Sequence, residues 1–342
     1  MPSDNLVSVY TNLGRYERAL DEARETLQLQ PDRVNSYEDV SGTYLLLDRQ
    51  DEAEGVLKQA EEHKLESQNL LGQRYYLAFK KGDAREMERL VQVAAGKPGA
   101  ESLLLLYHGV AKAYYGQVSK ARPLFRQSAD SCERNGSMET SALVQAILGL
   151  IEAHVGYSQQ ARADVEAALG RVMSRNTEVE AALPLALTGD TKRAEKLAAE
   201  LAKNFPLDTG VQHYYLPTTR AAITLVHKNP ARTVEFLRPM IPYEFGAMTN
   251  LDPIYLRGQA FLTLHDGTAA ASEFQKIIDH PGIIGLHVVG SLAHLGLARA
   301  YAIEGDTVKS RAAYQDFLTL WKDADPDIPI FKQAKAEYAK LQ

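Results

Sequence analysis

Histidine is the side chain of this sequence best suited to hold a metal ion, and the chain has nine of them. His280, His287 and His294 follow one another at intervals of seven residues. On a helix the last two would share a face but lie about 10 Å apart, at a rise of about 1.5 Å per residue, which is too far to share one ion. No two histidines stand three or four residues apart. We therefore expect neither a metal site nor a cofactor.

Three aspartates near the C-terminus, Asp323, Asp325 and Asp327, have the spacing of the start of a calcium-binding loop. Such a loop also requires glycine at the position of Ile328 and a bidentate glutamate at that of Ala334, and the sequence provides neither. These aspartates are therefore interpreted as residues that end and cap helices.

No set of residues has the pattern of a nucleophilic enzyme. The single cysteine, Cys132, leaves no internal disulfide and lies among Asp130, Glu133 and Arg134, which do not favour a reactive thiolate. No Gly-x-Ser-x-Gly turn is present. We predict that the chain is not an enzyme.

Charge and hydropathy limit the possible partners. The 342 residues carry a formal net charge of −6, and no cluster of five or more lysines and arginines occurs, which argues against nucleic acid or an anionic membrane. No basic start followed by an apolar stretch marks the N-terminus. The most apolar windows, 103–107 and 142–150, fall short of the roughly 20 residues of a membrane span. We expect a soluble, cytoplasmic chain without membrane contact.

The elements that position these residues follow from an internal repeat. Ala19 and Ala53 stand 34 residues apart. Small or apolar residues continue the series at Met87, Ala121, Ala161, Ala194, Val234, Ala270 and Ser310. With Ala19 and Ala53, the series marks nine units. A period of roughly 20 to 50 residues is typical of solenoids, in which each unit buries its apolar face on its neighbours.

A second mark accompanies the repeat. Glycine stands five residues before the small position in six units, at Gly14, Gly82, Gly116, Gly156, Gly189 and Gly305. Glycine there suits a helix that ends in a left-handed residue. In three units the next residue is an aspartate that could cap the following helix: Asp83, Asp190 and Asp306. Each unit is therefore predicted to be helix, tight turn, helix, and we expect essentially no sheet.

A unit of this length, with an aromatic residue in the first helix and alanine near the turn in the second, resembles the tetratricopeptide repeat (TPR). The clearest copies are 6–31, 37–65, 258–277 and 294–317. The resemblance implies an all-α fold, a right-handed superhelical solenoid of about nine TPR-like helix-turn-helix units with a C-terminal capping helix. The capping helix is expected to carry Lys332, Lys335, Glu337 and Lys340 on its outer face, where they would solubilise the end of an open stack.

The repeat predicts five regions along the chain. Residues 1–100 form N-terminal TPR units, the first of which has a short or clipped first helix, and residues 101–205 form the central units. Residues 206–250 form a degenerate unit rich in proline. Residues 251–325 form the C-terminal units, and 326–342 the capping helix.

The C-terminal stretch also resembles the C-terminal TPR region of acidobacterial-type bacterial serine/threonine protein kinases. Four segments carry this resemblance: 255–260, 273–277, 295–301 and 317–329. The full-length family has an N-terminal kinase domain, but this chain has no Gly-x-Gly-x-x-Gly loop, no His-Arg-Asp, no Asp-Phe-Gly and no Ala-Pro-Glu. The resemblance implies an alternative function, as a detached sensory or scaffolding region of a kinase signalling system.

In the TPR family the first helices line the concave side of the superhelix and select the ligand. By register, the predicted groove consists of Tyr76, Phe79, Leu103, Leu106, Val110, Tyr114, Ala146, Leu150 and His154. His227 is expected on the same inner face. Such a groove would take an amphipathic helix or an extended apolar peptide, although the same stripe could instead be core. A clamp for a peptide carboxylate is not expected, because the corresponding helix offers Asp4 and Ser8.

Together these observations predict a non-catalytic protein–protein interaction scaffold that binds a protein or peptide segment on its concave surface. Self-association through the solenoid ends is a further possibility, because the first unit would expose Leu6 and Tyr10.

Overall fold

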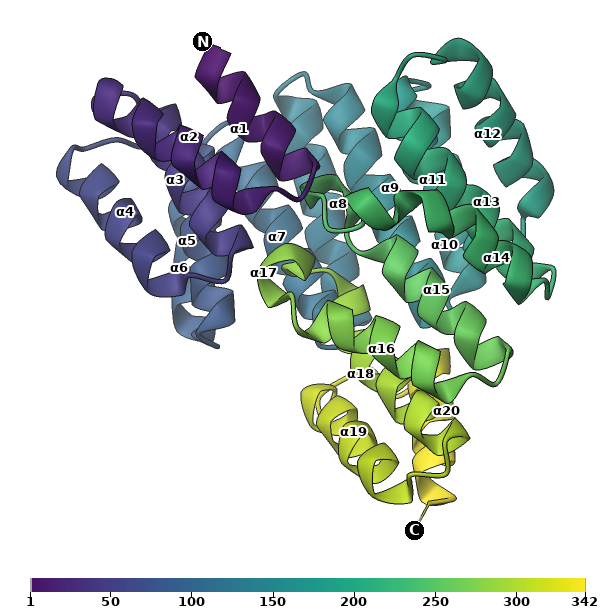
Figure 1. Ribbon diagram of the computed structural model, residues 1–342. Helices are drawn as coiled ribbons and strands as arrows, with labels where there is room; N and C mark the ends of the chain where they lie inside the picture. Colours follow the sequence, from purple (N-terminus) through teal and green to yellow (C-terminus); the bar gives the residue numbers. More distant parts are fainter. Residues whose placement is uncertain (1, 342) are drawn as a thin grey trace.

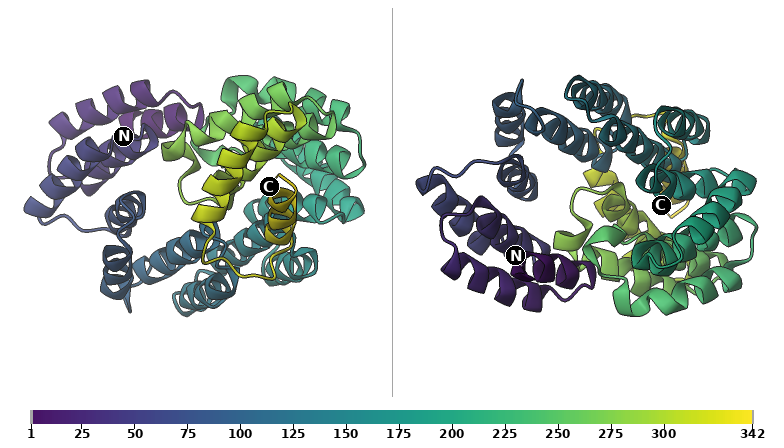
Figure 2. Two further views of the ribbon diagram at one scale, coloured as in Figure 1. Left: turned by 90° about the horizontal axis from the view of Figure 1, so that it is seen from below. Right: turned by 90° about the horizontal axis from the view of Figure 1, so that it is seen from above.

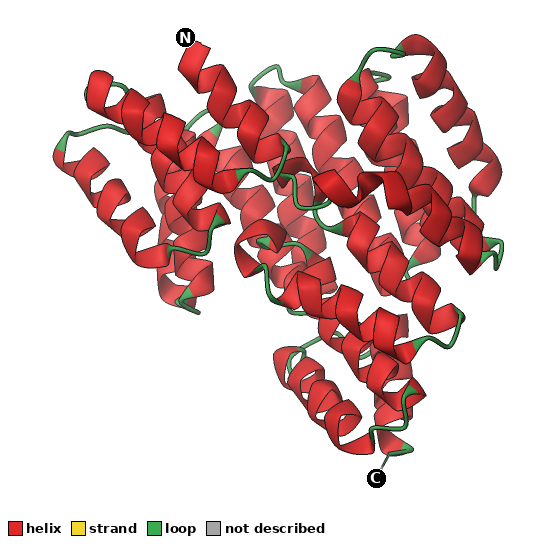
Figure 3. Cartoon of the chain, in the orientation of Figure 1, coloured by secondary structure: helices red, strands yellow, loops and turns green. Residues whose placement is uncertain are grey.

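The computed structural model describes residues 2–341, and within them it contains helices, turns and no strand (Figure 3). Eighteen of the helices form nine antiparallel pairs. The first helices of the pairs are α1 (Pro2–Asn12), α3 (Val34–Leu46), α5 (Gln68–Lys80), α7 (Ala100–Tyr114), α9 (Met138–Val155), α11 (Arg175–Leu187), α13 (Leu216–Val226), α15 (Asp252–Thr263) and α18 (Val288–Ile303). The second helices are α2 (Tyr16–Leu29), α4 (Gln50–Glu62), α6 (Ala84–Ala94), α8 (Val118–Arg134), α10 (Ser158–Arg171), α12 (Thr191–Asn204), α14 (Pro230–Leu237), α16 (Gly267–Ile278) and α19 (Thr307–Leu320). The all-α repeat architecture is therefore confirmed.

Shorter elements complete the chain. A π-helical turn, η1 (Val211–Tyr215), runs into α13, and two 3₁₀ turns, η2 (Arg238–Tyr243) and η3 (Ala247–Thr249), follow α14. The helix α17 (Pro281–Ile284) lies between α16 and α18, and α20 (Pro329–Ala339) ends the fold.

The turn inside each unit has the left-handed residue that the glycines predict. All six glycines have φ between 67° and 95°. The other three units use Asp48, Lys228 and His265, each with φ of 57°, at the same place. A residue with a side chain is strained in this region of backbone space, so the sequence offered no mark of these three turns.

The seventh unit corrects the predicted register by one residue. Thr233, not Val234, occupies the small position: it is fully buried and lies five residues after the left-handed Lys228. Its hydroxyl contacts the carbonyl of Ala221 on α13 at 3.3 Å. Proline at position 230 starts α14, and this fixes where the buried face of the helix falls.

The predicted aspartate caps are observed in two of three cases. Asp83 accepts a hydrogen bond from the amide of Glu86, and Asp306 accepts one from the amide of Lys309, both at 3.0 Å. Asp190 makes no such cap and lies 3.7 Å from the guanidinium of Arg193.

Close packing between neighbouring units depends on small residues that face large ones. Phe274 on α16 is fully buried between Gly258 of α15 and Gly296 of α18. A Cβ atom would lie 2.8 Å from the phenylalanine ring at Gly258 and 2.5 Å from it at Gly296. The absence of both side chains therefore allows three helices from two units to meet around one ring.

The superhelix closes on itself. The first seven units follow an arc that returns to its start, so that the segment after α14 reaches α1 and α2 (Figure 2). The hydroxyl of Tyr16 donates to the carbonyl of Phe245 there. From this point the chain continues beneath and inside the first turn: α17 contacts α3, α18 contacts α7 and α9, and α20 contacts α9 (Figure 1).

This arrangement differs from the open stack with a solvated final helix that the sequence suggests. One hydrophobic cluster joins Phe125 and Ile151 of the central units to Phe274, Leu292 and Trp321 of the last two. Glu337 of α20, expected on the outer face, pairs with Arg299 at 2.9 Å. The helix therefore packs between α9 and α19 because its neighbours on both sides offer apolar surface.

Candidate functional site

Hydrogen bonds between distant segments hold the last two units against the first turn. Tyr76 of α5 donates to the carbonyl of Pro281 at 2.9 Å, and the indole of Trp321 donates to the carbonyl of Tyr114 at 3.0 Å. Tyr157 donates to the carboxylate of Asp327 at 2.7 Å. Each contact places a C-terminal element against a first helix or a turn of units three to five. The chain itself therefore covers part of the concave side.

The nine residues of the predicted groove separate into two groups. Four are buried by neighbouring helices, namely Phe79, Ala146, Leu150 and His154. Five remain partly exposed, namely Tyr76, Leu103, Leu106, Val110 and Tyr114. Tyr114 borders one cleft of about 620 Å³ between α7 and α19. Tyr76, Leu106, Val110 and Leu150 border another, which is described next.

The second cleft, here called the central cleft, has a volume of about 490 Å³. One wall comes from α7 and α9 and includes Leu106, Val110 and Ile147. The facing wall comes from α17 and the turn that follows it and includes Ile283 and Leu286. Side chains of units that are far apart in sequence therefore form its two sides, and both walls are largely apolar.

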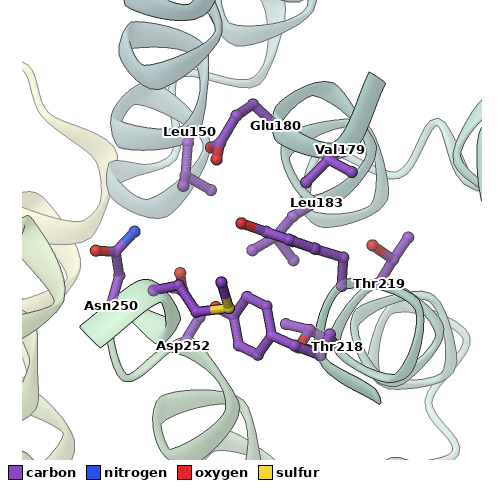
Figure 4. Close-up of a pocket in the computed structure, with 11 residues that line it drawn as sticks. Leu150, Val179, Glu180, Leu183, Thr218, Thr219, Asn250 and Asp252 are labelled. Atoms are coloured by element: carbon purple, nitrogen blue, oxygen red, sulfur yellow. Dashed lines mark hydrogen bonds between the residues drawn. The ribbon is translucent and has the colours of Figure 1, made fainter. Parts of the chain in front are cut away.

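A smaller recess of about 20 Å³ adjoins the central cleft and shares Leu150, Glu180 and Asn250 with it. Figure 4 shows the carboxyl group of Glu180 pointing into the recess from α11, with Asn250 and Asp252 on the opposite side. The pKa of the Glu180 carboxyl is raised to about 7, mainly by burial and to a lesser extent by the neighbouring Asp252, while Arg175 opposes the shift. In the part of the chain that the structure describes, no hydrogen bond or ion pair engages this carboxyl group.

Two histidines lie beside the recess. His154 Nε2 is 3.0 Å from a carboxylate oxygen of Asp252, and both side chains are 2% exposed. The ring of His287 lies 5.9 Å from that of His154. His287 Nδ1 accepts from the amide of Val289 at 3.4 Å, so Nε2 carries the proton. Burial lowers the pKa of His287 to about 4, which keeps the ring neutral at pH 7.

The Nε2–H group of His287 is a buried donor without a partner among the described residues. Buried polar groups normally find a hydrogen bond, because leaving one unpaired costs about 1–3 kcal/mol. His287 also borders the central cleft. Two residues that border the cleft therefore have polar groups without a partner in the described chain: the donor Nε2–H of His287 and the carboxyl group of Glu180.

The backbone that carries Asn250 and Asp252 is strained. Asn250 and Leu251 are consecutive left-handed residues with φ of 45° and 56°. The surroundings hold this conformation: Tyr214 donates to the carbonyl of Thr249 at 2.5 Å, and the amide of Leu251 contacts the hydroxyl of Thr249 at 3.3 Å. Strain of this kind, of order 1–3 kcal/mol per residue, clusters at sites that bind ligands.

Sequence reasoning anticipated His154 on the inner face but missed the other polar members of this site. Glu180, Asn250, Asp252 and His287 come from four separate segments, and no spacing marks them. His227, expected on the same face, is exposed and contacts Thr191 at 3.1 Å, away from the cleft.

None of the described residues form a group of three or more histidine, cysteine, aspartate or glutamate side chains able to hold a metal ion. His280, one of the three spaced by seven, bonds instead to the carbonyl of Lys276 at 2.7 Å. Within residues 2–341, no helix has the length and hydropathy to cross a membrane.

Comparison with known proteins places the fold but not the ligand. No protein-family model matches the chain, and no curated protein matches its sequence. Among solved structures, the human IFIT1 dimer with PPP-AAAA is 14% identical over 98% of this chain and 80% of that one, with a TM-score of 0.51. A tetratricopeptide repeat protein from Parabacteroides merdae is 14% identical over 85% of this chain and 99% of that one, with a TM-score of 0.37.

The APC/C hetero-tetramer Cut9–Hcn1 is 12% identical over 96% of this chain, with a TM-score of 0.47, and the chain spans 59% of the length of the protein it matches there. At these identities the likeness is one of fold alone. The chain has the all-helical solenoid fold of TPR proteins.

Proposed function

We propose that this TPR-like solenoid is a non-catalytic scaffold that holds a short extended segment of a partner protein in the central cleft. The observation that carries the proposal is the cleft itself, about 490 Å³ of space on the concave side between α7, α9 and α17. Its walls are apolar, as in most sites that bind ligands. Two bordering residues with unpaired polar groups, His287 and Glu180, would orient what enters.

The size of the cleft favours an extended segment over a helix. The volume lies within the roughly 300–1,000 Å³ of sites that enclose small ligands, whereas an α-helix with its side chains is about 10–12 Å across. The last two units already occupy the space that a helix would take, because α18 lies against α7 and α9. A few side chains of a partner therefore fill the remaining cleft.

A catalytic role is not proposed. The pair His154 and Asp252 resembles two members of a hydrolytic triad, but no serine, threonine or cysteine hydrogen-bonds to His154 among the described residues. Cys132 is buried, and burial raises the pKa of its thiol, which disfavours the reactive thiolate.

Selection of peptides on the immobilised chain, followed by calorimetry, tests the proposal. A random-peptide phage library should yield apolar peptides that bind with Kd of about 1 μM, or about −8 kcal/mol. Leu106→Asp places a charge in the apolar wall and should weaken binding at least about tenfold, or about 1.4 kcal/mol. Leu207→Asp is the matched control, because Leu207 is 95% exposed and lies outside the cleft. Equal binding by both variants would remove the cleft from the proposal.

The alternative function, in a kinase signalling system, rests on the sequence resemblance of 255–329 alone. Its test is genetic: a reading frame directly upstream that ends in a kinase domain would favour it. Incubation of the pure chain with labelled ATP should show no incorporation under either function.

Self-association through the first helix remains a separate prediction. Leu6 and Val9 on α1 are 39% and 49% exposed. Light scattering at several concentrations would detect an assembly that these residues support.

A further inference from the structure

We infer that the recess beside the central cleft receives the primary ammonium group of a lysine side chain carried by the bound segment. The inference rests on the proposed function, since the segment lies in the cleft. It adds which side chain the segment must have and which residue of this chain recognises it.

The size of the recess selects a small head group. Its volume of about 20 Å³ is close to that of one water-sized group, for which roughly 10–15 Å³ is the minimum. An ammonium group is compact and suits this space, whereas a guanidinium is a wide planar fork. The aliphatic stem of lysine would lie along Leu150, which borders both the recess and the cleft.

The charge of the recess selects a cation. Glu180 points into it without an ion-pair partner in the described chain, and Asp252 adds a second carboxylate nearby (Figure 4). The charge of Arg175 lowers the pKa of Glu180, but this guanidinium already donates two hydrogen bonds to the carboxylate of Asp208, at 2.9 and 3.0 Å. A bound ammonium would therefore supply the charge that the site lacks.

An independent feature indicates that the cleft has a ligand. The Nε2–H group of His287 is buried and unpaired, and the residue is 8% exposed at the edge of the cleft. Because this group is a donor, its complement is an oxygen acceptor. A peptide backbone has a carbonyl oxygen close to every side chain, so a lysine residue at Glu180 also offers an acceptor, which His287 would reach by turning its ring toward the cleft.

The recess is also preorganised. The strained pair Asn250 and Leu251 sets the backbone just before Asp252, and Tyr214 holds this segment through the carbonyl of Thr249. Side chains held in place before binding lose little entropy when the ligand arrives. The strained backbone of Asn250 and Leu251 would therefore serve to hold the recess in its binding conformation.

Ionisation of Glu180 makes binding dependent on pH. The ionisable groups around Glu180 come from every element that surrounds the recess: Arg175 on α11, Tyr214 and Tyr215 on η1, and Asp252 on α15. Beyond them, His154 contacts the carboxylate of Asp252, and His287 lies beside both. Only Glu180 in this set has a pKa raised to about 7. Its ionised fraction, and with it the affinity for a cation, should rise about tenfold from about pH 6 to about pH 8.

The test uses the full chain and the capped peptide acetyl-Leu-Lys-Leu-amide, titrated by nuclear magnetic resonance. Binding should move the amide signals of residues around the recess, and Glu180→Gln should weaken it at least about tenfold. Glu178→Gln is the matched control, since Glu178 lies on the same helix, does not border the recess and interacts with Glu200 instead. The gain in affinity from about pH 6 to about pH 8 should appear in the native chain and be absent in Glu180→Gln.

Three further peptides identify the group that is recognised. Acetyl-lysine or arginine in place of lysine should abolish the effect of Glu180→Gln. A peptide with a free N-terminus and no lysine should bind no better than its capped form, and tighter binding would show that the terminal amine is the true ligand and overturn the lysine assignment.

The outcomes separate the two proposals. If Leu106→Asp weakens apolar peptides while Glu180→Gln leaves the lysine peptide unaffected, the cleft stands and the lysine site falls. If neither change affects any peptide, both fall. Equal binding of lysine and acetyl-lysine peptides would also refute the lysine site.

Discussion

Glu180 should make the chain less stable as the pH rises, and the structure gives the size of the effect. The pKa of this carboxyl is 4.5 in an unfolded chain and about 7 in the fold, mainly because of burial. The folded state therefore favours the protonated form. Its contribution is complete below about pH 4.5 and is lost as the pH rises through about 7.

A difference of this size corresponds to about 3 kcal/mol, at about 1.4 kcal/mol for each tenfold change in proton affinity. Glu180 is partly exposed, and solvent screening reduces the figure, so we expect about 1–2 kcal/mol. Glu180→Gln removes the ionisable group at nearly constant size. The variant should therefore match the native chain near about pH 4 and exceed its stability by about 1–2 kcal/mol near about pH 8.

Urea unfolding followed by circular dichroism measures this difference at each pH. The native midpoint should fall relative to that of Glu180→Gln as the pH rises from about 5 to about 8. A difference between the two proteins that stays constant over this range would refute the burial of Glu180 in the recess. The same variant gains stability and loses lysine binding, which is the expected trade-off at a functional acid.

Three other changes test the packing that forms the site. Gly296→Ala places a Cβ atom 2.5 Å from Phe274 and should lower the free energy of unfolding by about 1–3 kcal/mol, measured by thermal melting; an unchanged melting temperature would contradict the close packing. Arg257→Ala removes the buried cation that Glu244 and Glu273 share and leaves them only the partly exposed Lys276, at 3.5 and 3.1 Å. The change should cost about 3 kcal/mol in urea unfolding, and the cost should disappear at a pH low enough to protonate both carboxylates. Asp325→Ala removes the carboxylate that accepts hydrogen bonds from the amide and the hydroxyl of Ser119, both at 2.6 Å. Hydrogen exchange of the α20 amides should become about ten times faster. Unchanged exchange would show that this contact does not hold the C-terminal helix.

The periodic features of the chain were predictable because they depend on local chemistry. The recurrence of Ala19 and Ala53, and the glycines five residues earlier, specify where a helix turns and where a neighbour can approach. The register failed only where the local signal was weak: Val234 has the expected apolar character, but the turn at Lys228 assigns the buried position to Thr233.

The candidate site was less predictable for a physical reason. Periodicity shows which face of a helix is apolar, but not whether that face meets solvent, a partner or another part of the same chain. Leu106 and Leu150 satisfy the same pattern, yet Leu106 borders the central cleft partly exposed whereas Leu150 is 4% exposed. The polar residues of the recess have no common spacing at all.

The amino-acid sequence by itself thus determined the helix-turn-helix unit and the number of units, because each follows from contacts within a unit or with the next one. Only the tertiary structure decided that the last units return to the inner side of the first turn. That return depends on the accumulated curvature of many small interfaces, and it brings Glu180, Asp252 and His287 together. The cleft and its recess are therefore products of closure, not of any single repeat.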